Sequence, residues 1–225
     1  MSVRPRSVGA MSPLEIVVRG VARRKFRPER AILYLTVHRE GWSRESVYRD
    51  AATVHGAVVE SLKDLLARDV IDEWSSDTLR VFSYRPYDGD GHRQDPAYST
   101  RIRIDAVFTD FEELSKFIDR WAAADGVDVG NVEWAITQDN RRTYERDLRR
   151  EAVDDAVAKA QAYSDAVGRG AVTATQLADP NMLSDSGASM VRAASIAAPG
   201  AAPALELRSE DIEIAVAVDA RFLAS

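Results

Sequence analysis

Residues 31–39 read Ala-Ile-Leu-Tyr-Leu-Thr-Val-His-Arg, and this stretch decides the fold class of the chain. Successive side chains of a β-strand point to opposite faces, so alternate residues of the stretch share a face. One face carries Ala31, Leu33, Leu35 and Val37, and the other carries Ile32, Tyr34, Thr36 and His38. Apolar residues on both faces are typical of a central strand that is covered on both sides. The stretch therefore predicts a sheet with this strand in its interior.

A helix is expected after this strand. Ser43 is suited to the N-cap position, because its hydroxyl can accept a hydrogen bond from a free amide of the first turn. Apolar residues then recur at steps of three and four, which is the period of one helix face. They are Val47, Ala51, Val54, Val58, Leu62 and Leu65. This spacing predicts an amphipathic helix that ends near Ala67.

Three more strands and a second helix extend the pattern. The alternation in residues 79–85 and 100–108, with a polar loop between them, predicts a β-hairpin. A helix with an acidic N-cap is predicted at 110–124, and a further strand at 127–137. Over residues 31–137 the expected order is β-α-β-β-α-β, the split arrangement of ferredoxin-like units.

Further elements flank this stretch. A strand is expected at 15–22, followed by a charged turn over 23–30. A long helix over 140–167 presents a stripe of mostly small side chains, which allows close approach to a partner. A weak strand at 171–178 and a regularly alternating strand at 211–222 come last. The expected fold class is α+β, with a mostly antiparallel or mixed sheet and the helices packed on one face.

The expected domain organisation is a short tail and one domain. Residues 1–13 are predicted to be a disordered tail, and residues 14–225 a single α+β domain. Residues from about 179 to 207 are rich in Ala, Ser, Gly and Pro, which predicts a mobile loop. The tail lacks the apolar run of a secretory signal, and no stretch approaches the ~18 apolar residues of a membrane span. A cytoplasmic location is therefore expected.

The composition excludes several kinds of chemistry. The chain has 225 residues, with 30 Lys and Arg against 36 Asp and Glu, so its net charge is −6. A protein that coats DNA or RNA needs a basic excess to neutralise phosphates, so this charge disfavours a nucleic-acid partner. Cysteine is absent, which excludes disulfides, thiolate catalysis and cysteine-based zinc or iron–sulfur sites.

The motifs of common catalytic and cofactor sites are also missing. The sequence contains neither the glycine-rich patterns of nucleotide-binding loops nor G-x-S-x-G. His38, His55 and His92 lack metal-ligand spacing. The loop that starts at Asp88 matches a calcium loop only at its first positions, because Arg93 stands where the glycine belongs, so a hairpin turn is expected. No catalytic, cofactor or metal residue is assigned, and a protein without enzymatic activity is favoured.

Basic residues form two clusters. The denser one comprises Arg23, Arg24, Lys25 and Arg27, and it is a candidate contact for an anion or a nucleic-acid backbone. The other lies between residues 141 and 150 and is interleaved with acidic residues. This interleaving predicts a solvated surface of salt bridges rather than a binding site.

Aromatic side chains are another candidate surface. Six of them are candidates to line a groove: Trp42, Trp74, Tyr84, Tyr87, Trp121 and Trp134. Aromatic residues more often belong to a core, and Trp121 and Trp134 fall on predicted apolar faces. These two are therefore expected to be buried.

Several short motifs resemble, in their order, those of the SIMPL-domain family. Three of them are the strand Ile16–Gly20, the Pro-Glu-Arg-Ala run that ends at Ala31, and Val129–Val132 before a strand. The most recognisable is the helix from Ala152, whose pattern A-x-x-D-A-x-x-K-A is similar to that of the family. The resemblance extends from about Leu14 to Phe222.

The resemblance implies an α+β fold and self-association into large rings or channel-like assemblies. Members of the family include a bacterial periplasmic immunogenic protein and proteins linked to oxidative stress. The resemblance implies no catalytic residues and no cofactor. Many members carry an export signal, and the sequence shows none, which favours the cytoplasm.

Three functions stay open at this point. The first is a non-enzymatic, self-associating homo-oligomer with a role in stress. The second is a small-ligand-binding module, or an enzyme, with a site under the loop at 180–203, since long irregular loops often cover sites. The third is a contact with an anion or a nucleic acid through Arg23–Arg27.

Overall fold

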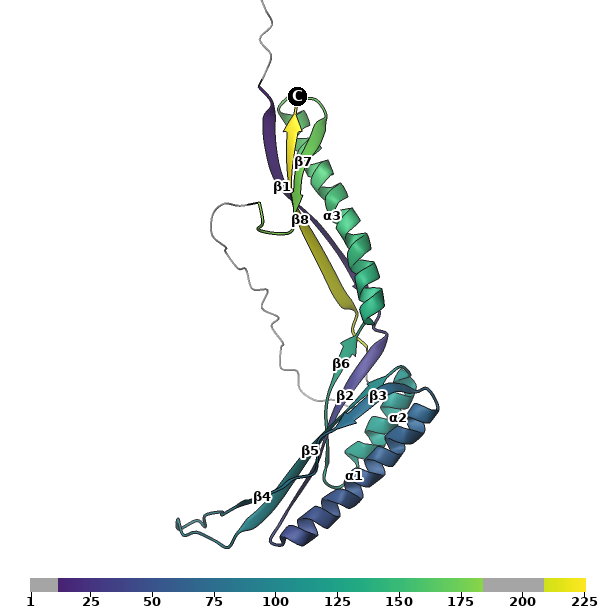
Figure 1. Cartoon of the computed structure of the whole chain (residues 1–225), viewed down its shortest axis with the longest axis vertical. Coiled ribbons are helices and arrows are strands. Elements are labelled where there is room, and N and C mark those ends of the chain that lie inside the picture. The colour runs from purple at the N-terminus through teal and green to yellow at the C-terminus, as the bar shows by residue number, and fades with distance from the viewer. Residues whose placement is uncertain (1–11, 184–208) are drawn as a thin grey trace, which may run out of the picture. The chain divides into compact units, whose positions relative to one another are not determined.

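The computed structural model describes residues 12–183 and 209–225, which form three helices and eight strands (Figure 1). The strand pairs with a defined register are antiparallel and the helices pack against the sheets, so the predicted α+β class is confirmed. No helix in these two ranges is long and apolar enough to cross a membrane. The predicted tail, 1–13, and the predicted mobile loop, 179–207, lie almost wholly outside the described residues.

The strands form two sheets rather than the one sheet expected, and the chain divides into two compact units. Among the described residues, the inserted unit comprises 27–137 and 209–212. The split unit comprises 12–26, 138–183 and 213–225, so it is assembled from the two ends of the chain. Each unit has its own apolar core. The single domain expected from the sequence stays a prediction.

The sheet of the inserted unit has five strands. They are β2 (Arg30–Gly41), β3 (Ile71–Ser76), β4 (Val81–Tyr84), β5 (Ala97–Phe108) and β6 (Val127–Ala135). The order is β3-β5-β2-β6, and β4 also pairs with β5. β2 therefore lies in the interior of the sheet, as predicted. Helix α1 (Arg44–Ala67) joins β2 to β3, and β5 lies between these two strands in the sheet, which is the split β-α-β arrangement expected. The ferredoxin-like interpretation of the whole unit stays a prediction.

Two helices, α1 and α2 (Phe111–Ala122), cover one face of this sheet (Figure 1). Ser43 caps α1 as predicted, since its hydroxyl accepts a hydrogen bond from the Ser46 amide. Asp110 caps α2, where its carboxylate accepts from the amides of Glu112 and Glu113. The predicted apolar stripe of α1 forms the core with one face of β2; its buried members are Val47, Ala51, Val58, Leu62 and Leu65.

The prediction that β2 is covered on both faces is wrong. Tyr34 is 37% exposed, and its neighbours on that face, such as Ile32, are only half-buried. The reason lies in the partner strands, which bring charged residues to the same face. Ile32 lies opposite Glu133, and Tyr34 lies opposite Asp105. A single apolar face is therefore enough to hold this strand at the centre of the sheet.

Two further sequence expectations are corrected by the structure. β3 was not expected, because Asp72 and Glu73 interrupt the alternation of apolar residues. The charged turn expected over 23–30 is wrong, because β1 (Leu14–Phe26) continues through the first basic residues. Helix α3 (Gln138–Ala166) holds the end of β1. Phe26, the last residue of β1, stacks against Tyr144 of α3 with 3.9 Å between ring centroids.

The split unit consists of a three-stranded sheet and α3. The order is β1-β8-β7, with β8 (Ile212–Ala224) in the middle and β7 (Val172–Ala178) at one edge. The predicted alternation of the last strand places Ala220 and Phe222 on one face, and both are part of the core of this unit. The buried stripe of α3 has mostly small side chains, as predicted: Leu148, Ala152, Ala156, Ala160 and Ser164.

The small side chains let α3 approach β1 very closely. At Gly20, an added Cβ would lie 1.9 Å from the carbonyl oxygen of Ala152 and 2.8 Å from the Cβ of Ala156. The first of these atoms belongs to the backbone, and the second is a methyl group that no side-chain rotation can move away. Gly20 is therefore required by space rather than by backbone conformation.

Replacing Gly20 with alanine is expected to destabilise the chain by about 2 kcal/mol or more, because the helix must move away from the sheet. Gly56 is the matched control, since it lies in α1 with nothing within 4 Å of an added Cβ. Gly56→Ala is expected to stabilise the chain by about 0.5–1 kcal/mol through helix propensity. Urea unfolding of the three proteins measures both effects. Equal stability of Gly20→Ala and the parent chain would contradict the close contact.

Candidate functional site

The predicted basic cluster lies mostly on β1 and is exposed. Arg24 points to the helix side of the strand, where it forms an ion pair with Glu151 of α3. Arg23 and Lys25 lie on the opposite side of β1. Within the described residues, Arg23, Lys25 and Arg27 have no ion-pair partner. Of the four basic residues, Arg24 thus forms an ion pair within the chain. An anion contact through Arg23, Lys25 and Arg27 stays a prediction.

The second basic cluster is the predicted salt-bridge surface. Along the first half of α3, arginines pair with acidic residues at distances from 3.6 to 3.9 Å. Examples are Arg149 with Glu145 and Arg142 with Asp139. Exposed pairs of this kind contribute little free energy, so the cluster keeps this part of the helix solvated without forming a site.

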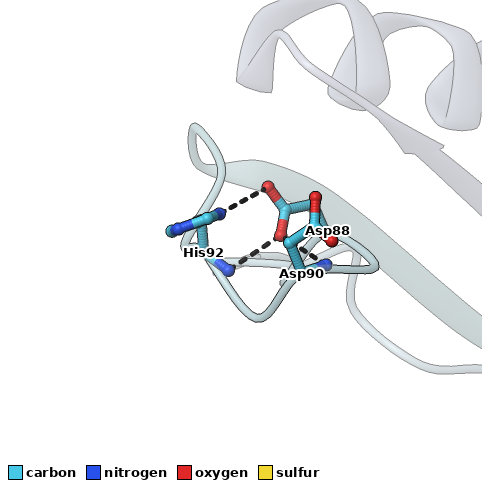
Figure 2. A group of neighbouring side chains, drawn as sticks. All are labelled: Asp88, Asp90 and His92. Carbon is cyan, nitrogen blue, oxygen red and sulfur yellow. Dashed lines mark hydrogen bonds and ion pairs between the residues drawn. The ribbon is translucent and has the colours of Figure 1, made fainter.

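The loop between β4 and β5 brings Asp88, Asp90 and His92 together (Figure 2). One ligand atom from each lies within 4.8 Å of the others, and this is the one such group in the part of the chain that the structure describes. The Asp88 carboxylate already accepts hydrogen bonds from the amides of Asp90, at 3.1 Å, and His92, at 2.8 Å. Its second oxygen lies 3.4 Å from Nδ1 of His92. The carboxylate therefore holds the hairpin turn that the sequence predicts.

The other two histidines lie at separate places in the inserted unit. His38 Nδ1 is 3.1 Å from Oδ2 of Asp128 across the sheet. His55 Nε2 is 2.8 Å from the hydroxyl of Ser76, which ties α1 to β3. Burial lowers the pKa of His55, so the imidazole is neutral near pH 7. The three histidines therefore serve three different local contacts.

A groove of about 520 Å³ lies between α1 and α2 and is lined by charged side chains. Arg68 contacts both Asp64, at 3.1 Å, and Glu113, at 3.0 Å. Lys116 also binds Glu113, and the two cations lower the pKa of that carboxyl group. A ligand in this groove would have to displace ion pairs that already satisfy these groups.

The aromatic residues divide between core and surface. Trp121 is buried, as expected, and Trp134 is only partly buried, packing edge-on against Phe111 with 5.0 Å between ring centroids. Trp42 and Tyr84, in contrast, are 65% and 44% exposed. They line a hollow of about 350 Å³, called the aromatic groove below. Its lining includes Glu40, Trp42, Tyr84, Pro86, Gln94 and Ala97.

In the split unit, no helix among the described residues covers one face of the sheet. α3 occupies one face of the β1-β8-β7 sheet, and the opposite face, called the open face, presents apolar side chains. Val17 is 55% exposed and Leu223 is 37% exposed. Ala215 is also exposed, and Val21 is half-buried.

Four charged residues on the open face form two pairs. Arg19 binds Asp219 through two hydrogen bonds, of 2.6 and 3.0 Å, and Arg221 binds Glu15 at 2.8 Å. Asp219 also accepts from the amide of Asn181 at 2.7 Å. The hydrogen bonds from Arg19, supported by the Asn181 amide, hold the pKa of Asp219 below its ordinary value although burial opposes this.

The helix motif that resembles the SIMPL pattern has a structural role. Asp155 accepts a hydrogen bond from the Val21 amide, at 2.8 Å, and from Lys159, at 2.6 Å. Lys159 in turn donates to the Arg19 carbonyl oxygen at 3.0 Å. The acidic and basic positions of the motif therefore bind the backbone of β1, while its alanines pack against that strand. Sequence reasoning did not identify this role, because polar residues on a helix usually face solvent.

A model of the SIMPL family, described as a protein of unknown function (DUF541), matches residues 16–222 of the chain. The matched range agrees with the resemblance stated from the short motifs. No curated protein matches the chain.

Replacing Asp219 with asparagine is expected to destabilise the chain by about 1 kcal/mol at pH 7, because the charged hydrogen bonds to Arg19 are weakened. The folded state lowers the pKa of Asp219, so its contribution is present above the unfolded value of about 4 and is lost as the pH falls below it. The difference from the parent chain is therefore expected to shrink on acidification. Urea unfolding at several pH values measures it.

Asp139 provides the control, because its side chain is almost fully exposed and lies 3.9 Å from its arginine partner. Asp139→Asn is expected to change the free energy of unfolding very little at any pH. A loss in Asp219→Asn that is equal at pH 7 and at acidic pH would contradict the role of the Asp219 charge.

Proposed function

The chain belongs to the SIMPL family, and from that premise we propose that it is a non-enzymatic protein that associates with further copies of itself. The observation that carries this proposal is the open face of the split unit. A sheet covered by a helix on one side, with apolar side chains exposed on the other, is suited to packing against a second layer. A second copy of the same face supplies such a layer.

The charges of the open face favour contact between identical surfaces. A contact around a two-fold axis places the same patch on both sides, so a patch of one sign would repel itself. Here Arg19 with Asp219 and Arg221 with Glu15 form two neutral pairs, whereas Arg23 and Lys25, near the end of β1, have no ion-pair partner among the described residues. A contact between identical copies is therefore favoured over the part of the open face that carries the two pairs, away from Arg23 and Lys25.

The exposed apolar side chains provide a driving force. Full burial of a valine or leucine side chain contributes about 1.5–3 kcal/mol. Val17 and Leu223 are exposed by more than a third in the single chain, so much of this free energy is still to be gained. Val21 and Ala215 extend the same surface.

Packing through the face is favoured over pairing at a strand edge. β8 lies in the middle of its sheet and has no free edge. The edge of β1 is partly occupied, since the Val21 amide binds Asp155 and the Arg19 carbonyl binds Lys159. An added strand would have to replace these contacts.

Other parts of the function stay predictions. A role in stress and a location in the cytoplasm rest on the resemblance and on the sequence. A ligand site under the loop at 180–203 concerns a segment of which only residues 180–183 are described. An anion contact through Arg23, Lys25 and Arg27 is a second candidate, supported by their exposure without an ion-pair partner among the described residues.

Light scattering coupled to size-exclusion chromatography tests self-association. The parent chain is expected to elute with a mass above that of one chain. This mass either rises with protein concentration, for a weak oligomer, or stays constant, for a tight one. Val17→Glu is expected to raise the dissociation constant about tenfold or more, because it buries an unpaired charge in the contact.

Val157→Glu is the matched control, since Val157 is 41% exposed on α3 and lies away from the open face. It is expected to leave the oligomer unchanged. A parent chain that stays monomeric at every soluble concentration would refute self-association. An oligomer that resists Val17→Glu would instead place the contact on another surface.

A further inference from the structure

We propose that the aromatic groove at the β4–β5 hairpin binds a neutral oligosaccharide. The hairpin extends beyond the body of the inserted sheet (Figure 1). Large aromatic side chains cost free energy when their faces stay in water, and an exposed group of them marks an interaction surface. The proposal rests on how these rings and the polar side chains around them are arranged.

The strand register fixes two aromatic rings on either side of a small residue. Tyr84 in β4 lies directly opposite Ala97 in β5. On the other side of β5, Gly41 lies opposite Tyr98, so Trp42 comes level with Ala97 one residue beyond that pair. Ala97 is 5% exposed and forms the floor, while Trp42 and Tyr84 form the walls.

Polar side chains with flat groups surround the rings. Glu40 and Gln94 line the aromatic groove, and Glu40 lies 3.5 Å from the hydroxyl of Tyr84. The backbone of Gln94 is fixed, since its amide donates to the Pro86 carbonyl oxygen at 2.9 Å. The rim thus offers an acceptor in Glu40 and both donors and acceptors in Gln94.

A second hollow, of about 470 Å³, continues from the first. It is lined by Trp42, Arg93, Gln94 and Asp95, so Trp42 and Gln94 belong to both hollows. Arg93 is held in place, because its Nε donates to the Tyr87 hydroxyl at 3.0 Å. Two hollows that share one wall suit a ligand of repeated units better than a single compact molecule.

The chemistry of the lining selects the ligand class. Glu40, Asp95 and Arg93 leave a single net negative charge, which disfavours phosphates, nucleic acids and other anions. The hollows are open and rimmed by polar groups, which disfavours a purely apolar ligand. A sugar ring has an apolar face that can stack on Trp42 or Tyr84, and its hydroxyls can pair with the carboxylate, amide and guanidinium groups.

A proline-rich peptide is the main competitor, because such peptides also dock on exposed aromatic rings. Proline has no N–H, so a peptide of this kind offers few donors. It would offer few hydrogen bonds to the carboxylates of Glu40 and Asp95. Sugar hydroxyls both donate and accept, and they match this lining.

Calorimetric titration of the full chain with cellohexaose, chitohexaose and maltohexaose tests the proposal. At least one of these sugars is expected to bind saturably and to change the tryptophan fluorescence, because Trp42 is 65% exposed. Trp42→Ala and Tyr84→Ala are each expected to weaken binding about tenfold or more. Both residues lie outside the apolar core, so thermal unfolding of these variants is expected to match that of the parent chain.

Tyr163→Ala is the matched control, since Tyr163 is an aromatic residue that is 61% exposed, lies on α3 and belongs to the split unit. It is expected to bind the sugar as the parent chain does. The proposal is overturned if none of the three sugars binds, if Trp42→Ala binds them unchanged, or if only a proline-rich peptide binds. Val17→Glu is expected to keep sugar binding, so failure of self-association and failure of this proposal are distinguishable.

Discussion

The close contact between α3 and β1 is the constraint on which the split unit depends. At Gly20 the carbonyl oxygen of Ala152 takes the place of a side chain, and the alanines of the helix keep this distance along the strand. Such proximity brings the Asp155 carboxylate and the Lys159 ammonium within reach of the backbone of β1. The alanines of this pattern, with one acidic and one basic residue, therefore act together to pack α3 against β1, and they lie within the range that the SIMPL family model matches.

Charge in this chain is used mainly to hold parts in place. Asp88 holds a turn, Asp110 caps a helix, and Asp219 joins β8 to Arg19 and to the amide of Asn181. Groups that are already paired have little capacity left for chemistry on a substrate. The two surfaces on which the proposals rest, the open face and the aromatic groove, are instead formed largely by exposed apolar and aromatic side chains.

The sequence was sufficient for the elements whose signal is local. The stripe from Val47 to Leu65, the caps at Ser43 and Asp110, and the alternating last strand all follow from one helix turn or one strand period. It was insufficient where partners far along the chain decide the outcome. The basic end of β1 is a strand because Phe26 stacks on Tyr144 of α3. One face of β2 stays exposed to solvent because Glu133 lies opposite Ile32 on that face. From the sequence, the aromatic residues could be named as candidates to line a groove, but not placed together. The registers of β4 and β2 with β5 bring Trp42 and Tyr84 to either side of Ala97.

The split unit also sets an order of events during synthesis. β1 is made before the inserted unit and its partner β8 after it, and Arg19 and Asp219 are 200 residues apart. The strands and helices of the inserted unit lie between them and can pair as soon as they emerge. β1 therefore stays unpaired while the inserted unit is made, with Val17 and Val21 exposed to other nascent chains. A cell that makes this protein has reason to shield β1 until β8 has been made.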